Sequence, residues 1–340
     1  MKSIQLINYG QAESAFELRE VPVPKPAAGE VLVKVAGFGL NYADVMSRNG
    51  LYRDAPPIPC VLGYEAVGTV SEIGAGVTNV SPGQHVLAFT RFGAYAEYVI
   101  TQSKAVVPVP DQMDNGVACA LATQYCTAYY AGCEMVNLQK GDHVLIHAAA
   151  GGVGIGLVQL AKLKGCVIYG TAGNNEKINF LKSIGVDHPI NYNTSDFSEE
   201  IKKIRGEKGL DVVFDSIGGS VFSKSRGLLS FGGRIVGYGA AERSGKSGGV
   251  FADLKLLFGF GFLNAAFLLM SSRGVIGVNM LRIADHKPDV LQRCLENVVA
   301  LFSTGKIQPH VGGRFNASEI TLAHQLLESR KSIGKIVVEW

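Results

Sequence analysis

A cluster of glycines joins an apolar strand to an apolar helix near the middle of this 340-residue chain. The turn reads AAAGGVG over 148–154 and contains Ala150, Gly151, Gly152, Val153 and Gly154. Glycines at such a turn permit a tight bend, let the backbone approach a pyrophosphate and allow the helix to pack closely on the strand. Free N–H groups and the positive end of the helix dipole then hold the phosphates. The turn predicts a dinucleotide-binding site.

The end of the following strand indicates which dinucleotide is bound. A site that selects NAD places Asp or Glu there for the ribose 2′-hydroxyl. Here the strand 166–172 runs into Gly173 and two asparagines, and Lys177 follows in the first helical turn. Lysine attracts a 2′-phosphate, although a solvated helix residue is the alternative for Lys177. Tyr192 follows the third strand, where its ring can stack near the adenine and its hydroxyl reach the phosphate, so the sequence favours NADPH.

Alternating strands and helices surround this turn. The predicted strands are short and apolar and cover 143–149, 166–172, 188–193, 210–218 and 234–240. Predicted helices fill the intervals between them. This alternation is typical of a doubly wound parallel sheet in an α/β protein.

The first hundred residues have a different texture. Short strands broken by Gly and Pro predict a mostly antiparallel, barrel-like domain. The last seventy residues return to mixed texture and end in the strand IGKIVVEW, which we expect to complete that domain. The expected division is therefore 1–123 and 266–340 for the barrel-like domain, and 124–265 for the nucleotide-binding domain.

Composition excludes several classes of protein. Hydrophobic residues make up 47% and charged residues 18%, which excludes a disordered chain. A net charge of +3 without charge runs gives no sign of a nucleic-acid partner. Six cysteines without a CxxC pair favour reduced thiols and a cytoplasmic location. The apolar stretch 256–270 is shorter than the ~20 residues that span a bilayer, which leaves a buried helix, an apolar lid, a subunit contact or peripheral membrane contact.

The glycine turn belongs to a longer signature. The run GDHVLIHAAAGGVGIGLVQLAK over 141–162 resembles that of the quinone oxidoreductase group of the medium-chain dehydrogenase/reductase superfamily. The resemblance covers essentially the whole chain, including NYAD at 41–44, TAY at 127–129 and GK at 334–335. The apolar insertion around 250–270 and the phrases GLYRDAPPIP and GKIQPH are most similar to the vesicle amine transport protein homologues. The resemblance to this superfamily implies a GroES-like catalytic domain together with a Rossmann domain. It also implies a homodimer formed through an edge strand near 274–282.

The same resemblance bears on metal binding. Zinc-dependent members use a cysteine where this chain has Asn41, a histidine where it has Tyr64, and a third ligand near Thr123. Amide, phenol and hydroxyl groups do not replace thiolate and imidazole ligands of zinc. The structural zinc lobe with four cysteines has no counterpart either. The resemblance therefore implies a zinc-independent reductase without a metal site.

Residues for the chemistry follow from the resemblance. It places Asn41, Asp44 and Tyr52 around the nicotinamide and the acceptor, and Asn41 then positions nicotinamide or substrate while Tyr52 donates to the acceptor oxygen. Asp44 fixes the local network in this interpretation; a helix cap is its alternative, and packing in a proline-rich turn is the alternative for Tyr52. Quinones and α,β-unsaturated carbonyls accept hydride with one or two such donors.

The remaining cofactor contacts are expected from position and resemblance. Thr127 would meet the nicotinamide ribose or carboxamide, and Lys335 would close over the pyrophosphate or ribose. Thr171 would join Gly173, Lys177 and Tyr192 around the adenosine phosphate. Residues at the ends of the later strands complete the set; they are Ser216, Gly218, Gly237, Tyr238, Gly239 and, from the second domain, Val278 and Asn279.

The sequence thus predicts an NADPH-dependent, zinc-independent oxidoreductase that transfers hydride to a quinone or an α,β-unsaturated carbonyl. The alternative is a nucleotide-binding, membrane-associated or lipid-handling protein with little catalytic turnover. The natural acceptor stays open.

Overall fold

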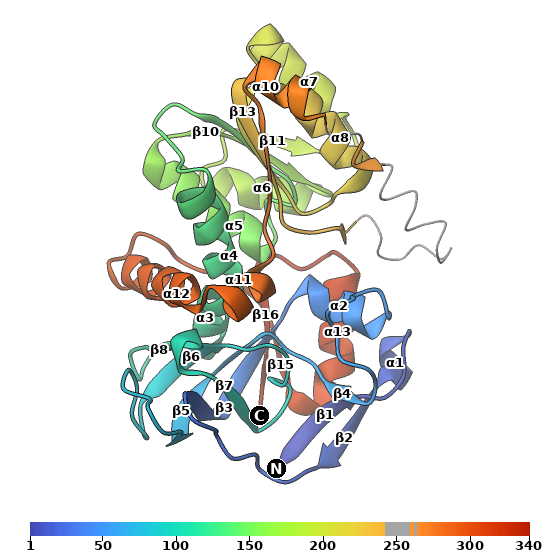
Figure 1. Ribbon diagram of the computed structural model, residues 1–340. Coiled ribbons are helices and arrows are strands. Elements are labelled where there is room, and N and C mark those ends of the chain that lie inside the picture. Colours follow the sequence, from blue (N-terminus) through green and yellow to red (C-terminus); the bar gives the residue numbers. More distant parts are fainter. Residues whose placement is uncertain (242–258, 262–263) are drawn as a thin grey trace. The chain divides into compact units, whose positions relative to one another are not determined.

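The computed structural model describes residues 1–241, 259–261 and 264–340 (Figure 1). These residues form two compact units. The antiparallel unit comprises Met1–Cys126 and Met280–Trp340, and the parallel unit comprises Thr127–Asn279.

The parallel unit is built on a sheet of six parallel strands in the order β11-β10-β9-β12-β13-β14. The strands are β9 (His143–Ile146), β10 (Val167–Ala172), β11 (His188–Asn191), β12 (Leu210–Asp215), β13 (Leu229–Gly237) and β14 (Gly274–Gly277). The helices are α5 (Gly152–Lys164), α6 (Asn175–Ser183), α7 (Phe197–Arg205), α8 (Gly219–Gly227) and α10 (Ala265–Ser271). The chain moves outward from β9 to β11 and then restarts at β12 on the other side of β9. This reversal defines a doubly wound Rossmann sheet and confirms the predicted fold class.

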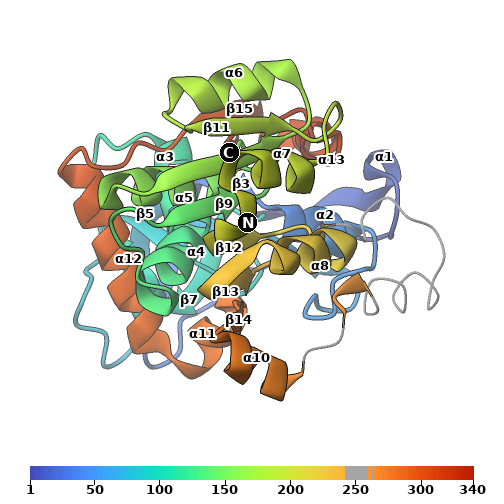
Figure 2. The ribbon, with the colours of Figure 1, turned by 90° about the horizontal axis from the view of Figure 1, so that it is seen from above.

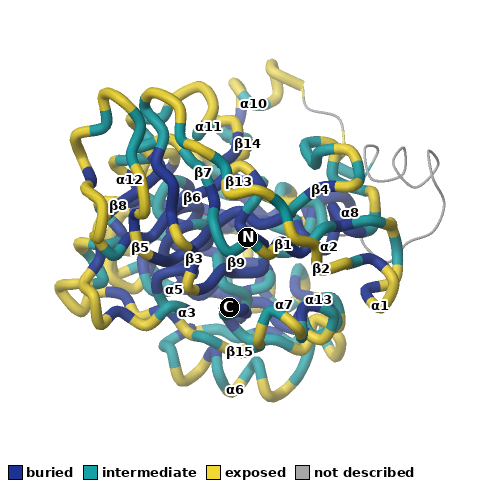
Figure 3. The backbone as a smooth tube through the Cα atoms, turned by 90° about the horizontal axis from the view of Figure 1, so that it is seen from below, coloured by how far each residue is buried: buried dark blue, intermediate teal, exposed yellow. Residues whose placement is uncertain are grey.

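Both faces of this sheet are covered, which is why its strands are apolar. Tyr169 of β10 packs into a cluster with Phe197 of α7 and Phe222 of α8. The next residue, Gly170, faces the other way, with the Leu181 side chain of α6 close to the position a Cβ would occupy. Figure 2 shows these helices around the strands, and Figure 3 shows that β9 is buried.

The antiparallel unit contains a seven-stranded and a three-stranded sheet. The larger sheet has β3 (Glu30–Leu40), β5 (Glu65–Ile73), β6 (His85–Phe89), β7 (Tyr98–Gln102), β8 (Val106–Pro108), β15 (Val311–Asn316) and β16 (Lys335–Glu339). The smaller has β1 (Lys2–Leu6), β2 (Phe16–Glu20) and β4 (Cys60–Val61). Its helices are α1 (Ala12–Ala15), α2 (Tyr42–Arg48), α3 (Asn115–Ala120), α11 (Met280–His286), α12 (Pro288–Ser303) and α13 (Ile320–Glu328). A further helix, α4 (Cys126–Tyr129), bridges the two ranges in sequence and is flanked by π-helical segments at Leu121–Tyr125 and Tyr130–Met135.

One expected boundary differs from the structure. Residues 266–279 were expected in the barrel-like domain, but β14 pairs with β13 in parallel register, with Val275 opposite Ile235. Four residues with two glycines carry little strand signal of their own, so only the pairing reveals them as the sixth strand. The closing strand β16 pairs with β3 in the antiparallel unit, with Val338 opposite Phe38.

Candidate active site

The glycine turn is fastened to the strands on both sides of β9. The amide of His147 donates to the Phe214 carbonyl of β12 at 3.0 Å, and the amide of Ala149 donates to the Thr171 carbonyl of β10 at 3.0 Å. Ala148 adopts a left-handed conformation with φ of 48°. The turn is therefore held in one shape at the point where the sheet reverses its order.

The helix that follows the turn begins without a side-chain cap. Gly151 is the N-cap of α5, and no described side chain caps that helix. By contrast, Asn174 caps α6 and Asp196 caps α7 with side-chain oxygens. The first N–H groups of a helix have no partner within it and carry the positive end of its dipole, so the start of α5 is suited to an anion.

Gly154 makes the close approach at this turn possible. A Cβ at Gly154 would lie 2.5 Å from the Ala148 carbonyl oxygen and 2.7 Å from the Ala149 Cα. Any larger residue would push the helix away from the turn. The residues present fit the pyrophosphate of a dinucleotide.

The structure brings together three of the residues predicted around the adenosine phosphate. The Tyr192 amide donates to the Ala172 carbonyl at 3.1 Å, and a Cβ on Gly173 would lie 2.5 Å from the Tyr192 hydroxyl. Lys177 lies in the first turn of α6, where its amide donates to Asn174 Oδ1 at 2.8 Å. Burial lowers the pKa of Lys177. Strand β10 is followed here by Gly173 and two asparagines, without a carboxylate.

Thr171 occupies a different position from the one expected. Its hydroxyl lies 3.1 Å from Nδ1 of the buried His147, whose Nε2 lies 2.8 Å from the Ser225 hydroxyl. Burial lowers the pKa of His147 to about 3, so this imidazole is neutral. The Thr171 side chain points into the core because of strand alternation, and its carbonyl fastens the glycine turn instead.

The ends of β12 and β13 meet at the carboxyl edge of the sheet. Asp215 lies opposite Gly237, and the Tyr238 amide donates to the Asp215 carbonyl at 2.9 Å. A Cβ on Gly239 would lie 2.7 Å from the Ser216 carbonyl oxygen, so the two loops are in contact. The structure therefore gathers Ser216, Gly237, Tyr238 and Gly239 at the edge where such sheets bind ligands.

Asp215 is a residue that sequence reasoning missed. Its buried Oδ1 accepts the amides of Ile217 at 2.6 Å and Gly218 at 3.1 Å. It thus shapes the loop that carries Gly218. A carboxylate as the last residue of an apolar strand was the available signal.

Val278 and Asn279 lie at the same edge. The Val278 amide donates to the Gly237 carbonyl at 2.9 Å. These residues were expected to come from the barrel-like domain, but they continue β14 of the parallel unit. Thr127 is the first residue of that unit and is buried on α4.

A buried polar cluster lies at the end of β3 in the antiparallel unit. Lys335 and Glu65 form an ion pair in which both side chains are fully buried. Asn41 Nδ2 donates to Glu65 Oε2 at 2.6 Å, and Lys335 Nζ donates to Asn41 Oδ1 and to the Leu40 carbonyl, both at 3.2 Å. A Cβ on Gly39 would lie 2.0 Å from Glu65 Oε1, so glycine at this position makes room for the pair.

Lys335 therefore differs from its expected surroundings. Its three ammonium protons face Glu65, Asn41 and the Leu40 carbonyl. In this arrangement the lysine neutralises a buried carboxylate and orients the Asn41 amide. A buried charge without such a partner would be costly, which explains the pairing.

Asp44 lies on the first turn of α2, next to this cluster. Its Oδ2 accepts the Asn41 amide at 2.7 Å, as in a helix cap. The side chain is fully buried, and burial together with the nearby Glu65 charge raises the pKa of Asp44 to about 8. The hydrogen bond from the Asn41 amide to Asp44 therefore both caps α2 and fixes the local network around Asn41.

Tyr52 and Tyr64 form an aromatic pair in the same unit. Their ring centroids are 6.1 Å apart with an edge-to-face angle of 78°. The Thr123 hydroxyl donates to the Tyr64 carbonyl at 3.3 Å. Since Glu65 bonds Asn41, the three positions compared with zinc ligands gather around the start of β5.

These positions carry an amide, a phenol and a hydroxyl. The Asn41 oxygen already faces the Lys335 ammonium, a resident positive charge. Within the described ranges, no group of three or more His, Cys, Asp or Glu side chains is arranged to hold a metal ion.

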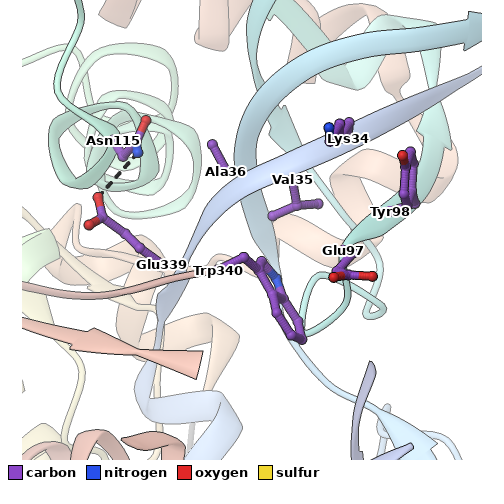
Figure 4. A pocket seen from close by; sticks show the side chains of 8 residues that line it. All are labelled: Lys34, Val35, Ala36, Glu97, Tyr98, Asn115, Glu339 and Trp340. Carbon is purple, nitrogen blue, oxygen red and sulfur yellow. Dashed lines mark hydrogen bonds between the residues drawn. The ribbon is translucent and has the colours of Figure 1, made fainter. Parts of the chain in front are cut away.

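A cavity of about 660 Å³ opens elsewhere on the antiparallel unit (Figure 4). Its lining comes from three strands and the α3 start and consists of Lys34, Val35, Ala36, Glu97, Tyr98, Asn115, Glu339 and Trp340. None of the predicted site residues belongs to this lining.

The apolar stretch 256–270 is described only at 259–261 and 264–270. In α10, Phe267, Leu269 and Met270 expose 53%, 81% and 84% of their surface. None of the helices in the described part of the chain has the length and apolarity needed to cross a membrane.

Comparisons with known proteins agree with this architecture. Residues 27–111 match the alcohol dehydrogenase GroES-like domain, and residues 152–296 match the zinc-binding dehydrogenase family. The synaptic vesicle membrane protein VAT-1 homolog of Homo sapiens is 33% identical over 341 residues, which cover 99% of this chain and 86% of that protein.

Two solved structures extend the comparison. The Escherichia coli quinone oxidoreductase complexed with NADPH is 27% identical with a TM-score of 0.86, and the match covers 100% of both chains. The CurK enoyl reductase is 28% identical with a TM-score of 0.84, and the match covers 99% of this chain and 98% of that chain.

A GroES-like unit and a Rossmann unit with a glycine-rich turn define the architecture of this class of oxidoreductase. The chain belongs to the medium-chain dehydrogenase/reductase superfamily, close to the VAT-1 homologues.

Proposed function

We propose that this protein is an NADPH-dependent, zinc-independent oxidoreductase that reduces a quinone or an α,β-unsaturated carbonyl. In the overall reaction, NADPH, a proton and the acceptor give NADP⁺ and the reduced acceptor. NADPH supplies the hydride when it is bound. The Escherichia coli quinone oxidoreductase in complex with NADPH and the CurK enoyl reductase are consistent with this class of reaction.

The start of α5 and the end of β10 support NADPH, rather than NADH, as the cofactor. Uncapped amides at Gly152–Gly154 suit the pyrophosphate. No carboxylate directly follows β10. We expect the Lys177 ammonium and the Tyr192 hydroxyl to meet the extra phosphate there. We assign the outer cofactor contacts to Thr127, Ser216–Gly218, Gly237–Gly239, Val278 and Asn279 on the same unit.

The Lys335 ammonium supports zinc independence. It supplies a positive charge to Glu65 and holds the Asn41 carbonyl oxygen, while the Asn41 amide group donates to Glu65. Asn41 is thereby fixed in one orientation. Tyr52 and Asn41 then bind and orient the acceptor, and Asp44 holds the backbone at Asn41.

The direct experiment follows NADPH oxidation with a panel of quinones and enones, together with the affinities for NADPH and NADH. We expect turnover with at least one acceptor and tighter binding of NADPH. Equal turnover after metal chelation would support the zinc-independent reaction. Tighter binding of NADH would contradict the role of Lys177, and no turnover with any acceptor would contradict the enzyme assignment.

The exposed apolar side chains of α10 favour a second candidate, a nucleotide-binding, membrane-associated or lipid-handling protein with little catalytic turnover. Phe267, Leu269 and Met270 present a surface suited to lipid contact. Liposome flotation at physiological salt, with and without NADPH, separates the two candidates. Strong flotation that is lost on changing Leu269 and Met270 to Ser would favour the second.

We further propose a cytoplasmic homodimer. All six cysteines are free thiols, as expected in a reducing compartment. Strand β14 is the edge of the parallel sheet and offers backbone groups for pairing with a second copy.

A further inference from the structure

Tyr64 is held rigidly at the start of β5. Its side chain is 3% exposed. Its carbonyl accepts the Thr90 amide at 2.8 Å and the Thr123 hydroxyl at 3.3 Å. The next residue, Glu65, is locked in the buried pair with Lys335. Both the strand and its neighbours therefore fix where the Tyr64 ring points.

The ring of Tyr64 lies between two other aromatic rings. Tyr52 meets it edge to face at 6.1 Å, and Phe92 packs on it at 5.1 Å. Phe92 has φ of 71°, a left-handed conformation that is strained for a bulky residue. Such strain persists where the surrounding structure requires it, and functional sites collect it.

The hydroxyl of Tyr64 is buried and has no hydrogen-bond partner among the described residues. The hydroxyls of Tyr52 and Ser47 lie near it, but Ser47 donates to the Ala43 carbonyl at 2.8 Å. A buried hydroxyl without a partner is disfavoured. The Tyr64 hydroxyl therefore keeps an unused hydrogen-bonding capacity among the described side chains.

The charge state of Tyr64 suits a donor. Burial raises the pKa of Tyr64 well above its usual range, and the neighbouring Asp44 charge acts in the same direction. The phenol keeps its proton at neutral pH and offers it to an acceptor without giving it away.

We propose that the Tyr64 hydroxyl is a catalytic hydrogen-bond donor to the acceptor's carbonyl oxygen, an inference that rests on the proposed function. For an enone, hydride adds to the β-carbon, the C=C electron pair moves to the α-carbon and carbonyl, and the oxygen becomes an enolate oxyanion. Tyr64 stabilises that oxyanion, and a proton from water completes the saturated ketone. Tyr64 thus acts beside Tyr52. The oxyanion that develops on the acceptor accepts the hydrogen bond for which the Tyr64 hydroxyl has no partner within the described chain.

The test uses Tyr64→Phe, which keeps the ring and removes only the hydroxyl. We expect kcat/KM for an enone to fall about 100-fold, with a smaller fall for a strongly electron-accepting quinone, which needs less help at oxygen. The affinity for NADPH, measured by fluorescence titration, should not change. Tyr98→Phe, on the wall of the separate cavity, is the activity control.

Thermal unfolding separates catalysis from a structural role. Removing an unpartnered hydroxyl should leave the Tm of Tyr64→Phe unchanged or higher. Tyr95→Phe is the matched control because the Tyr95 hydroxyl lies 3.1 Å from His324 Nε2, so its Tm should fall. A lower Tm for Tyr64→Phe would overturn the inference. If the wild type reduces an enone and Tyr64→Phe reduces it at the same rate, the inference is also overturned. If the wild type turns over no acceptor, that result contradicts the proposed function itself, and with it the role of Tyr64.

Discussion

Lys335→Met tests the buried ion pair at the end of β3 most directly. Both partners are fully buried, and Glu65 has no other cation in contact among the described ion pairs. Removing one partner of a buried pair leaves an uncompensated charge and costs about 3–5 kcal/mol. Exposed pairs contribute far less, about 0–1 kcal/mol.

The expected loss converts into a temperature shift. Domains of roughly 150–250 residues lose about 2–4 °C in Tm per kcal/mol. Lys335→Met should therefore lower the Tm of the antiparallel unit by about 6–20 °C. The double variant Lys335→Met, Glu65→Gln should recover most of this loss, because neither position then carries a charge and the Gln oxygen can still accept from Asn41.

Calorimetry of the full chain measures these shifts. Lys203→Met is the control, since its pair with Glu200 lies on the surface of α7 and should change the Tm by less than about 4 °C. A loss below about 1 kcal/mol for Lys335→Met, or no recovery in the double variant, would refute the picture of a desolvated pair.

Three further predictions concern pH and cofactor. The folded pKa of Asp44, about 8, lies above its ordinary value of 3.8, so the folded protein binds the extra proton and stability falls as pH rises through this interval; urea unfolding of Asp44→Asn between pH 5 and 8 should show a flatter profile. Gly154→Ala should weaken NADPH binding by more than tenfold in a fluorescence titration, because its Cβ meets the Ala148 carbonyl, while Gly227→Ala, with open space around its Cβ, should leave binding unchanged. Lys177→Gln should raise the Kd for NADPH about tenfold and leave that for NADH unchanged, and an equal change for both would contradict a 2′-phosphate contact.

The predicted nucleotide site illustrates what local sequence can show. A tight turn between a strand and a helix depends on residues adjacent in the chain, so Gly151–Gly154 could be identified without coordinates. The contact between Gly173 and Tyr192 followed from strand order, since both lie at the carboxyl ends of neighbouring strands.

The side-chain directions and remote pairs could not be obtained this way. Thr171 was expected at the cofactor, but strand alternation turns its hydroxyl into the core toward His147. Asp215 was overlooked because its function is to hold two amides of its own loop. The sixth strand, β14, became visible only through its pairing with β13.

By itself, the sequence determined an α/β chain with a doubly wound nucleotide-binding sheet, a separate antiparallel domain and a turn shaped for phosphate. These follow from hydrophobic periodicity and glycine placement, which act over a few residues. The tertiary structure alone decided that Lys335 meets Glu65 across 270 positions of chain, that Gly39 leaves space for both, and that the Tyr64 hydroxyl remains unused. Burial, desolvation and hydrogen-bond satisfaction depend on which distant segments pack together, and no local pattern records that packing.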